Sequence, residues 1–123
     1  MVTPVIQCYF TNGIGNNIFQ YVYARLLAEK HGGVVSAVNG GHLVSTFAGL
    51  GIQIKKYPAS GLPVVIVNDT TASTVLYSKE FDNKDFVLKG YFSDYTFYKD
   101  YVDQIRSWFI CVEKLIQKIS FSI

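Results

Sequence analysis

The residues whose types and spacing could do chemistry lie in one stretch, Thr11–Gly32, with the sequence TNGIGNNIFQYVYARLLAEKHG. Gly13 and Gly15 form a glycine-rich turn, and the amides of Asn16 and Asn17 follow where an apolar helical pattern begins. Turns of this kind often bind a phosphate or another anion, because free N–H groups and the helix dipole point at it. The glycines would permit positive φ and close approach of a ligand. The alternative reading is a tight turn capped by asparagine, with no ligand.

Two phosphate-binding motifs are excluded by the residues that follow. The dinucleotide fingerprint G-x-G-x-x-G needs a third glycine where this chain has Ile18, and an acidic residue near Asn39. The P-loop needs Gly-Lys-Ser/Thr after its first glycine, and the chain has none there.

Metal chemistry has little support. Sugar transferases that need a divalent ion often carry D-x-D, with one residue between the aspartates, whereas two residues separate Asp82 from Asp85 and Asp100 from Asp103 here. The two histidines have no cysteine or acid at ligand spacing, so we expect no metal site and no cofactor. With so few histidines, no Ser-His-Asp arrangement can be proposed, and the catalytic residues stay unknown.

Cysteine and histidine usage has plain structural explanations. Cys8 and Cys111 lie in apolar runs far apart in the sequence, and we expect two buried free thiols rather than a disulfide or a catalytic thiol. His31 stands at the end of the predicted helix, where the helix dipole explains it.

Composition bounds the class of protein. Of 123 residues 50% are hydrophobic and 16% charged, which predicts one globular domain, 1–123, with apolar surface left for a homo-oligomer or another partner. The net charge of +2, with no basic run longer than Lys55-Lys56, argues against nucleic-acid binding. We expect a cytoplasmic chain, because no signal peptide is visible and the uncharged residues 31–54 contain too many polar residues and glycines for a membrane span.

Hydrophobic patterns predict an α/β fold with a parallel sheet, because a strand at 4–10, a helix at 16–31 and a strand at 34–38 form a βαβ unit. The other predicted elements are a short helix at 41–51, strands at 52–58, 62–68 and 85–92, a helix at 93–109 capped by Ser93 or Asp94, a helical continuation at 111–118 and a strand-like end at 119–123. Residues 69–84 give no prediction.

The stretch NGIGNNIFQYVYARLLAEKHG resembles the amino-terminal signature of bacterial α-1,2-fucosyltransferases, glycosyltransferase family 11, which runs roughly G-G-L-G-N-Q-M-F-Q-Y-A-x-A-R-A-L-A. The matching residues are Gly13, Gly15, Asn16, Phe19, Gln20, Tyr21, Arg25, Leu27 and Ala28. The chain departs from the signature at Asn12, Ile14, Asn17 and Ile18. A second segment, VLKGYFSDYTFYKDYVDQIRSWF, is similar to the family's L-x-G-Y-(F/W) segment and the helix after it.

The resemblance implies a three-layer, Rossmann-like sheet, equivalent to the amino-terminal domain of a GT-B-like glycosyltransferase. It implies metal-independent transfer of fucose from GDP-fucose to a sugar hydroxyl, with Gly13, Gly15, Asn16, Asn17 and Gln20 as candidate substrate-binding residues. The family's H-x-R-R-G-D motif, which holds the donor's pyrophosphate, is not in this sequence, whose two arginines are not adjacent. The chain therefore resembles the amino-terminal half of such an enzyme, truncated before its donor-binding element and inactive alone.

Three hypotheses stay open at this point. The first is a truncated or divergent fucosyltransferase domain, which would bind a nucleotide-sugar and a sugar acceptor. The second is a non-enzymatic carbohydrate- or protein-binding α/β module, or one that pairs with another chain. The third is an unrelated small α/β domain whose match is chance.

Overall fold

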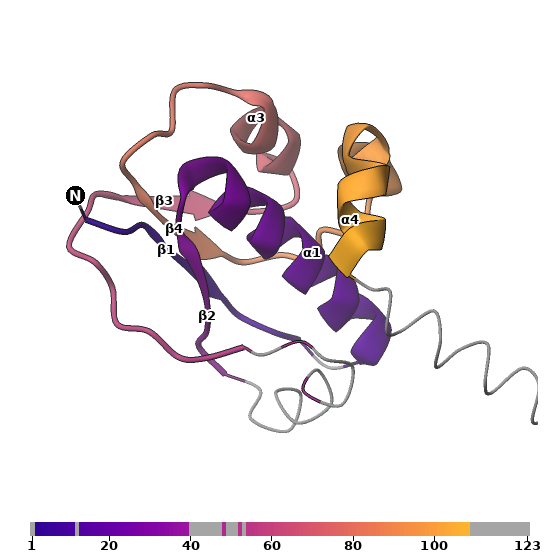
Figure 1. Ribbon diagram of the computed structural model, residues 1–123, viewed down its shortest axis with the longest axis horizontal. Helices are drawn as coiled ribbons and strands as arrows, with labels where there is room; N and C mark the ends of the chain where they lie inside the picture. The colour runs from indigo at the N-terminus through magenta and orange to yellow at the C-terminus, as the bar shows by residue number, and fades with distance from the viewer. Residues whose placement is uncertain (1, 12, 40–47, 49–51, 53, 109–123) are drawn as a thin grey trace, which may run out of the picture.

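The computed structural model describes residues 2–11, 13–39, 48, 52 and 54–108 and is built around a parallel sheet (Figure 1). The strands are β1 (Val5–Cys8), β2 (Val34–Ala37), β3 (Val64–Val67) and β4 (Asp85–Leu88). Their order in this 4-stranded sheet is β2-β1-β4-β3, and every neighbouring pair is parallel. This confirms the predicted α/β class with a parallel sheet, in an order consistent with a Rossmann-like arrangement.

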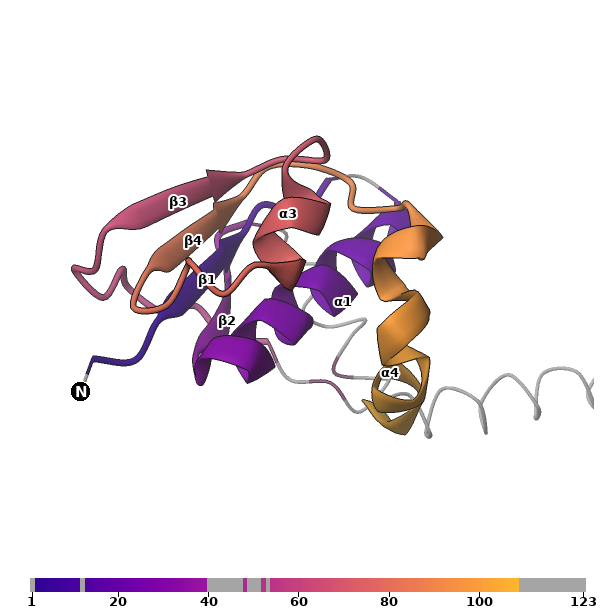
Figure 2. The same cartoon turned by 90° about the horizontal axis from the view of Figure 1, so that it is seen from above.

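The connections between the strands decide which face of the sheet the helices cover. They are α1 (Ile14–His31), α3 (Ala72–Tyr77), the 3-10 helix η1 (Tyr95–Tyr101) and α4 (Val102–Trp108). The connections β1-α1-β2 and β3-α3-β4 both step toward the β2 edge, so right-handed crossovers place both helices on the same face. Figure 2 shows α1, α3 and α4 on one side of the sheet. The third layer that the sequence predicts is not seen among the described residues.

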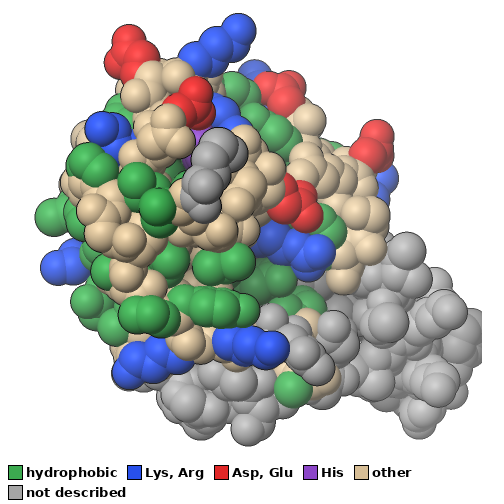
Figure 3. All heavy atoms as spheres, turned by 60° about the vertical axis from the view of Figure 1, so that its left-hand side comes forward, with side chains coloured by type: hydrophobic (Ala, Val, Ile, Leu, Met, Phe, Trp, Pro, Cys, Tyr) green, Lys and Arg blue, Asp and Glu red, His purple; other side chains and the backbone are tan. Residues whose placement is uncertain are grey.

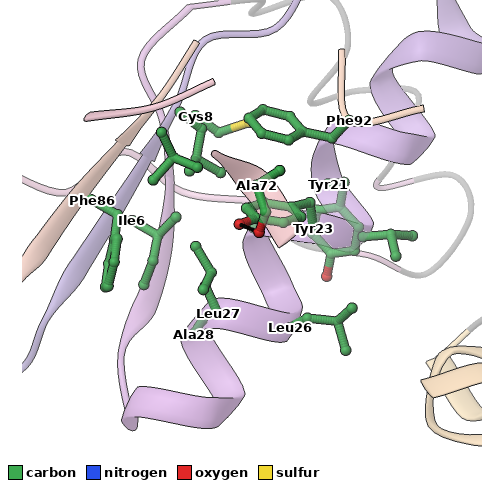
Figure 4. Close-up of a cluster of buried hydrophobic side chains, with 14 of the residues drawn as sticks. Ile6, Cys8, Tyr21, Tyr23, Leu26, Leu27, Ala28, Ala72, Phe86 and Phe92 are labelled. Atoms are coloured by element: carbon green, nitrogen blue, oxygen red, sulfur yellow. Dashed lines mark hydrogen bonds between the residues drawn. The ribbon is translucent and has the colours of Figure 1, made fainter. Parts of the chain in front are cut away.

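The core lies between the sheet and α1. Ile6 pairs with Val35 and Phe86, so these three side chains share the face that looks at the helices. Figure 4 shows Leu27 of α1 beside Ile6 and Phe86, and these three side chains are fully buried. Val35 is half-buried. Gly33 lets β2 begin close to β1, because a Cβ there would lie 2.6 Å from Pro4 O.

The first βαβ unit is predicted well. Helix α1 begins at Ile14, within two residues of the predicted Asn16. It ends as predicted at glycine, because Gly32 adopts φ 65° and donates its N–H to Ala28 O. None of the helices in the described part of the chain is long and apolar enough to cross a membrane.

Several predicted boundaries are wrong. The strand predicted over 85–92 ends at Leu88, and the unassigned 69–84 contains α3. The helix predicted over 93–109 begins as η1, with Asp94 as its cap accepting from Thr96 N at 3.0 Å, and becomes α-helical only at Val102. In the predicted strand 52–58, Lys55 makes one isolated bridge to Ser36. The predictions for 41–51, Ala48 excepted, and for 111–123 fall outside the described residues.

Candidate functional site at the strand ends

The glycine turn lies at the carboxyl end of β1 and opens helix α1. Gly13 precedes the helix with φ 98°, as expected of a glycine that the turn requires, and its carbonyl accepts from Asn17 N at 3.1 Å. Gly15 lies in the first helical turn and does not use the positive φ that a glycine permits. No atom lies within 4 Å of the place a Gly15 Cβ would occupy. Both glycines are exposed and Asn16 is half-buried.

The other two predicted residues, Asn17 and Gln20, are fully buried under the turn. Asn17 Nδ2 donates to Thr11 O at 2.8 Å and to Gln20 Oε1 at 3.1 Å. Asn17 Oδ1 is buried and has no partner among the described residues. A buried polar atom without a partner usually marks a missing water, ion or ligand.

Gln20 joins the two strands at the middle of the sheet. Its Nε2 donates to Gly90 O at 2.7 Å, after β4, and to Tyr9 O at 3.4 Å, after β1. Its Oε1 accepts from Thr11 N at 3.2 Å. The predicted set therefore divides by position: Gly13, Gly15 and Asn16 reach the surface, whereas Asn17 and Gln20 hold the backbone beneath it.

A second turn, Gly90–Phe92, follows β4 and meets the glycine turn. The Asp69 carboxylate, after β3, accepts from Tyr91 N at 3.1 Å and from Phe92 N at 2.6 Å. Gly90 is required by this closeness, because a Cβ would lie 3.0 Å from Asp69 Oδ2. Phe92 has φ 54°, a strained value for a large side chain, and its buried ring stacks on Tyr23 at 4.4 Å.

A hollow of about 410 Å³ lies between these turns, lined by Tyr9, Thr11, Lys89, Gly90 and Tyr91. Its volume is in the range of small-ligand sites, and ligands of open parallel sheets collect at this edge. Tyr9 and Tyr91 are 38% and 51% exposed, and Lys89 Nζ lies 5.5 Å from the Tyr9 ring centre. The pocket thus offers two aromatic surfaces and one cation.

Sequence reasoning missed the pocket residues as a site. Lys89, Gly90 and Tyr91 stand in the quoted KGYF segment and Thr11 opens the stretch Thr11–Gly32, and these were the available signals. Tyr9 belongs to neither segment. Asn39 also belongs to this edge, after β2, where its Oδ1 accepts from Phe10 N at 2.7 Å and its Nδ2 donates to Phe10 O at 3.0 Å.

The arginines lie away from the pocket. Arg25 forms an ion pair with Glu29 at 3.5 Å, donates to Tyr21 Oη at 3.1 Å and stacks 4.4 Å from the Trp108 ring centre. Arg106 lines a separate apolar hollow of about 480 Å³ between α1 and the helices η1 and α4. Neither guanidinium is therefore available for a phosphate at the strand ends.

Other reactive side chains are explained by packing. Cys8 is a buried free thiol, as predicted, and burial raises its pKa to about 12, which keeps it protonated and inert. Cys111 lies outside the described residues. Among the residues that the structure describes, no group of three or more His, Cys, Asp or Glu side chains could hold a metal ion.

Comparison with protein-family models, curated proteins and solved structures finds no match to this chain.

Proposed function

We propose that this chain is the amino-terminal, GT-B-like half of a fucosyltransferase-type glycosyltransferase, and that a sugar-nucleotide occupies the pocket at the strand ends. The observation that carries the proposal is the meeting of the two segments that resemble the family. The turn before α1 and the turn after β4 are far apart in the sequence, yet Gln20 Nε2 and Gly90 O are 2.7 Å apart. Thr11, which precedes the glycine turn, and Gly90 and Tyr91 of the second turn line one pocket, whereas the glycines themselves lie outside its lining.

Two positive groups near the pocket could receive an anionic group, although the Asp69 carboxylate also lies close, against Gly90 and Tyr91. The amino end of α1 carries the positive end of the helix dipole, and its first turn contains no acidic residue. Gly15 leaves this end open, because no protein atom fills the space beside it. Lys89 adds a full positive charge near Tyr9. A diphosphate could lie along the helix end while the sugar stacks on a tyrosine ring, whose negative face attracts C–H groups.

Binding by these groups alone should be weak. A helix amino end contributes about 1 kcal/mol, and about 2 kcal/mol in a favourable geometry. Arginine's planar fork is the stronger phosphate partner, and both arginines lie elsewhere. We expect GDP-fucose to bind with a Kd of about 1 mM or weaker. We expect no measurable transfer, because charge stabilisation at the departing GDP and a positioned acceptor are both needed.

Titration calorimetry of the 123-residue chain with GDP-fucose tests the proposal, together with a turnover assay on lactose-type acceptors. Lys89→Ala should weaken binding by about threefold to tenfold, whereas Lys56→Ala, another exposed lysine, should not change it. Equal affinities of the wild type and Lys89→Ala would contradict binding in this pocket. Micromolar binding that Asn16→Ala abolishes would mean that the glycine turn alone makes a donor site.

A second candidate is a carbohydrate-binding module without transferase activity. The exposed faces of Tyr9 and Tyr91 favour it, because a neutral sugar could stack on them without any phosphate group. The same titration separates the two functions. Fucose or lactose binding that GDP does not displace would favour the module, whereas binding of GDP itself would favour the transferase half.

A further inference from the structure

Strand β3 lies at the edge of the sheet, and no strand of the described part of the chain pairs with its outer side. Among the described residues it pairs only with β4, and Figure 2 shows it as the outermost strand. The carbonyls of Pro63 and Val67 accept from Asp85 N and Lys89 N, respectively. The backbone groups of the odd-numbered residues of β3 therefore point toward β4. Because bonding directions alternate along a strand, the N–H and C=O groups of Val64 and Ile66 point outward.

The same two residues also expose apolar side chains. Val64 is 55% and Ile66 62% exposed, on the face of the sheet opposite to α1. Seen from the left-hand side of Figure 1, hydrophobic side chains reach the surface at several places between charged ones (Figure 3). Edge strands are normally protected by a charged residue, yet 57–68 contains no Asp, Glu, Lys or Arg. Pro63 and the short length of β3 limit strand addition at this edge, but no charged residue opposes it over Val64–Val67.

We propose that β3 pairs antiparallel with β3 of a second copy, and that the two 4-stranded sheets become one continuous sheet. A two-fold axis normal to the sheet keeps the helices of both copies on the same face. Opposite residues must then share a face, which places Val64 of one copy opposite Ile66 of the other, and Val65 opposite itself. In this register every outward N–H and C=O of Val64 and Ile66 gains a partner.

The strand's own ends fit this register. Pro63 has no N–H to donate. Asn68 N already donates to Thr71 Oγ1 at 3.1 Å, and Asn68 O already accepts from Thr71 N at 3.2 Å. Pairing is thus confined to Val64–Val67. We take a second copy as the partner of this edge because its β3 has the same length and no charged residue. No like charges then face each other across the two strands. The contact is isologous and closes on itself instead of building a filament.

Sedimentation equilibrium of the full chain over a range of concentrations tests the proposal. The mass should rise from 13.8 kDa toward twice that value. Ile66→Lys places a charge beside the partner's strand and should weaken the dimer by at least about tenfold. Val102→Lys is the matched control, because Val102 is 40% exposed on α4, away from β3. Circular dichroism confirms that both variants fold.

Amide hydrogen exchange locates the interface. In the dimer the amides of Val64 and Ile66 should exchange more slowly as concentration rises, whereas those of Val65 and Val67 are protected already by β4. A monomer at every concentration would overturn the proposal. So would a dimer that Ile66→Lys leaves unchanged, or one in which the Val64 and Ile66 amides are not protected. Binding of a synthetic LPVVIVN peptide, residues 62–68, by a chain that stays monomeric would also overturn the dimer and would make this edge a site for extended peptides.

Discussion

The side-chain amide of Gln20 donates to the backbone carbonyl of Gly90 at 2.7 Å, and this bond joins α1 to the turn after β4. Gln20 is fully buried, and its Oε1 accepts from Thr11 N at 3.2 Å. One side chain therefore satisfies backbone groups at the ends of both central strands. The pocket between Tyr9 and Tyr91 depends on these turns for its shape.

Replacing Gln20 should destabilise the whole domain. Gln20→Met keeps the volume but leaves Thr11 N, Tyr9 O and Gly90 O without their side-chain partner, and unsatisfied buried groups cost about 1–3 kcal/mol each. We expect the free energy of unfolding to fall by at least about 3 kcal/mol in urea titrations. Gln104→Ala, which removes an exposed amide on α4, should change it by less than about 0.5 kcal/mol. A Gln20→Met variant as stable as the wild type would show that the network does not stabilise the fold.

Gln20 also marks the limit of what the sequence could tell. The pattern around it identifies a helix and a family resemblance, and both suggest a residue that faces a ligand. Its actual partner stands 70 residues further along the chain, and only the pairing of β1 with β4 brings the two together. By contrast, the glycine turn, α1 and the parallel βαβ unit depend on local patterns and were predictable.

The missed elements have local reasons. Helix α3 has only 6 residues, ASTVLY, which is too short for a helical period to appear in the sequence. The segment after β4 keeps an apolar alternation, but Asp69 binds Tyr91 N and Phe92 N and turns the chain out of the sheet. A carboxylate from a distant loop cannot be read from the pattern of the segment that it redirects.

Gly13 and Gly15 should respond in opposite ways to alanine. Gly15→Ala adds a methyl group where nothing lies within 4 Å, inside a helix, and should stabilise the fold by about 0.5–1 kcal/mol. Gly13→Ala forces an L-residue to φ 98° and should destabilise it by about 1–2 kcal/mol. Thermal unfolding measures both changes. If the proposed ligand approaches the helix end, Gly15→Ala should also weaken GDP-fucose binding, and unchanged binding would move the ligand away from this turn.

Asp69 should control the mobility of the Gly90–Phe92 turn. Asp69→Ala removes the acceptor of two backbone N–H groups and leaves Phe92 at φ 54° without that support. We expect the amides of Tyr91 and Phe92 to exchange at least about tenfold faster by hydrogen-exchange measurements. Asp103→Ala, on α4, is the control and should leave these two amides as they are. Equal exchange rates in the wild type and Asp69→Ala would mean that the buried Phe92 ring alone holds the turn.

His31 should make the domain sensitive to mild acid. Its side chain is 1% exposed and its ring lies 5.2 Å from that of Phe86, so it is a packed residue and not only a partner of the helix dipole. Burial lowers the pKa of His31 below 6.5, and the charge of Lys30 lowers it further. The Asp82 carboxylate, with Oδ1 3.2 Å from His31 Nδ1, opposes this shift and raises the pKa. The folded state therefore holds the ring neutral at pH values where an unfolded chain would protonate it.

The sign of the pH effect follows from this difference. Above about pH 6.5 neither state is protonated at His31, and its contribution to stability is complete. As pH falls below 6.5 the unfolded chain binds the proton first, so the free energy of unfolding should drop until the lower pKa of the folded state is passed. Each tenfold difference in proton affinity between the two states is worth about 1.4 kcal/mol.

His31→Gln should make the free energy of unfolding in urea nearly independent of pH between pH 7 and about pH 5. Asp82→Asn should make it fall more steeply, because the variant removes the charge that opposes the pKa shift of His31. A wild type whose stability does not fall in this range would contradict the prediction. An equal fall in His31→Gln would assign the acid sensitivity to other groups.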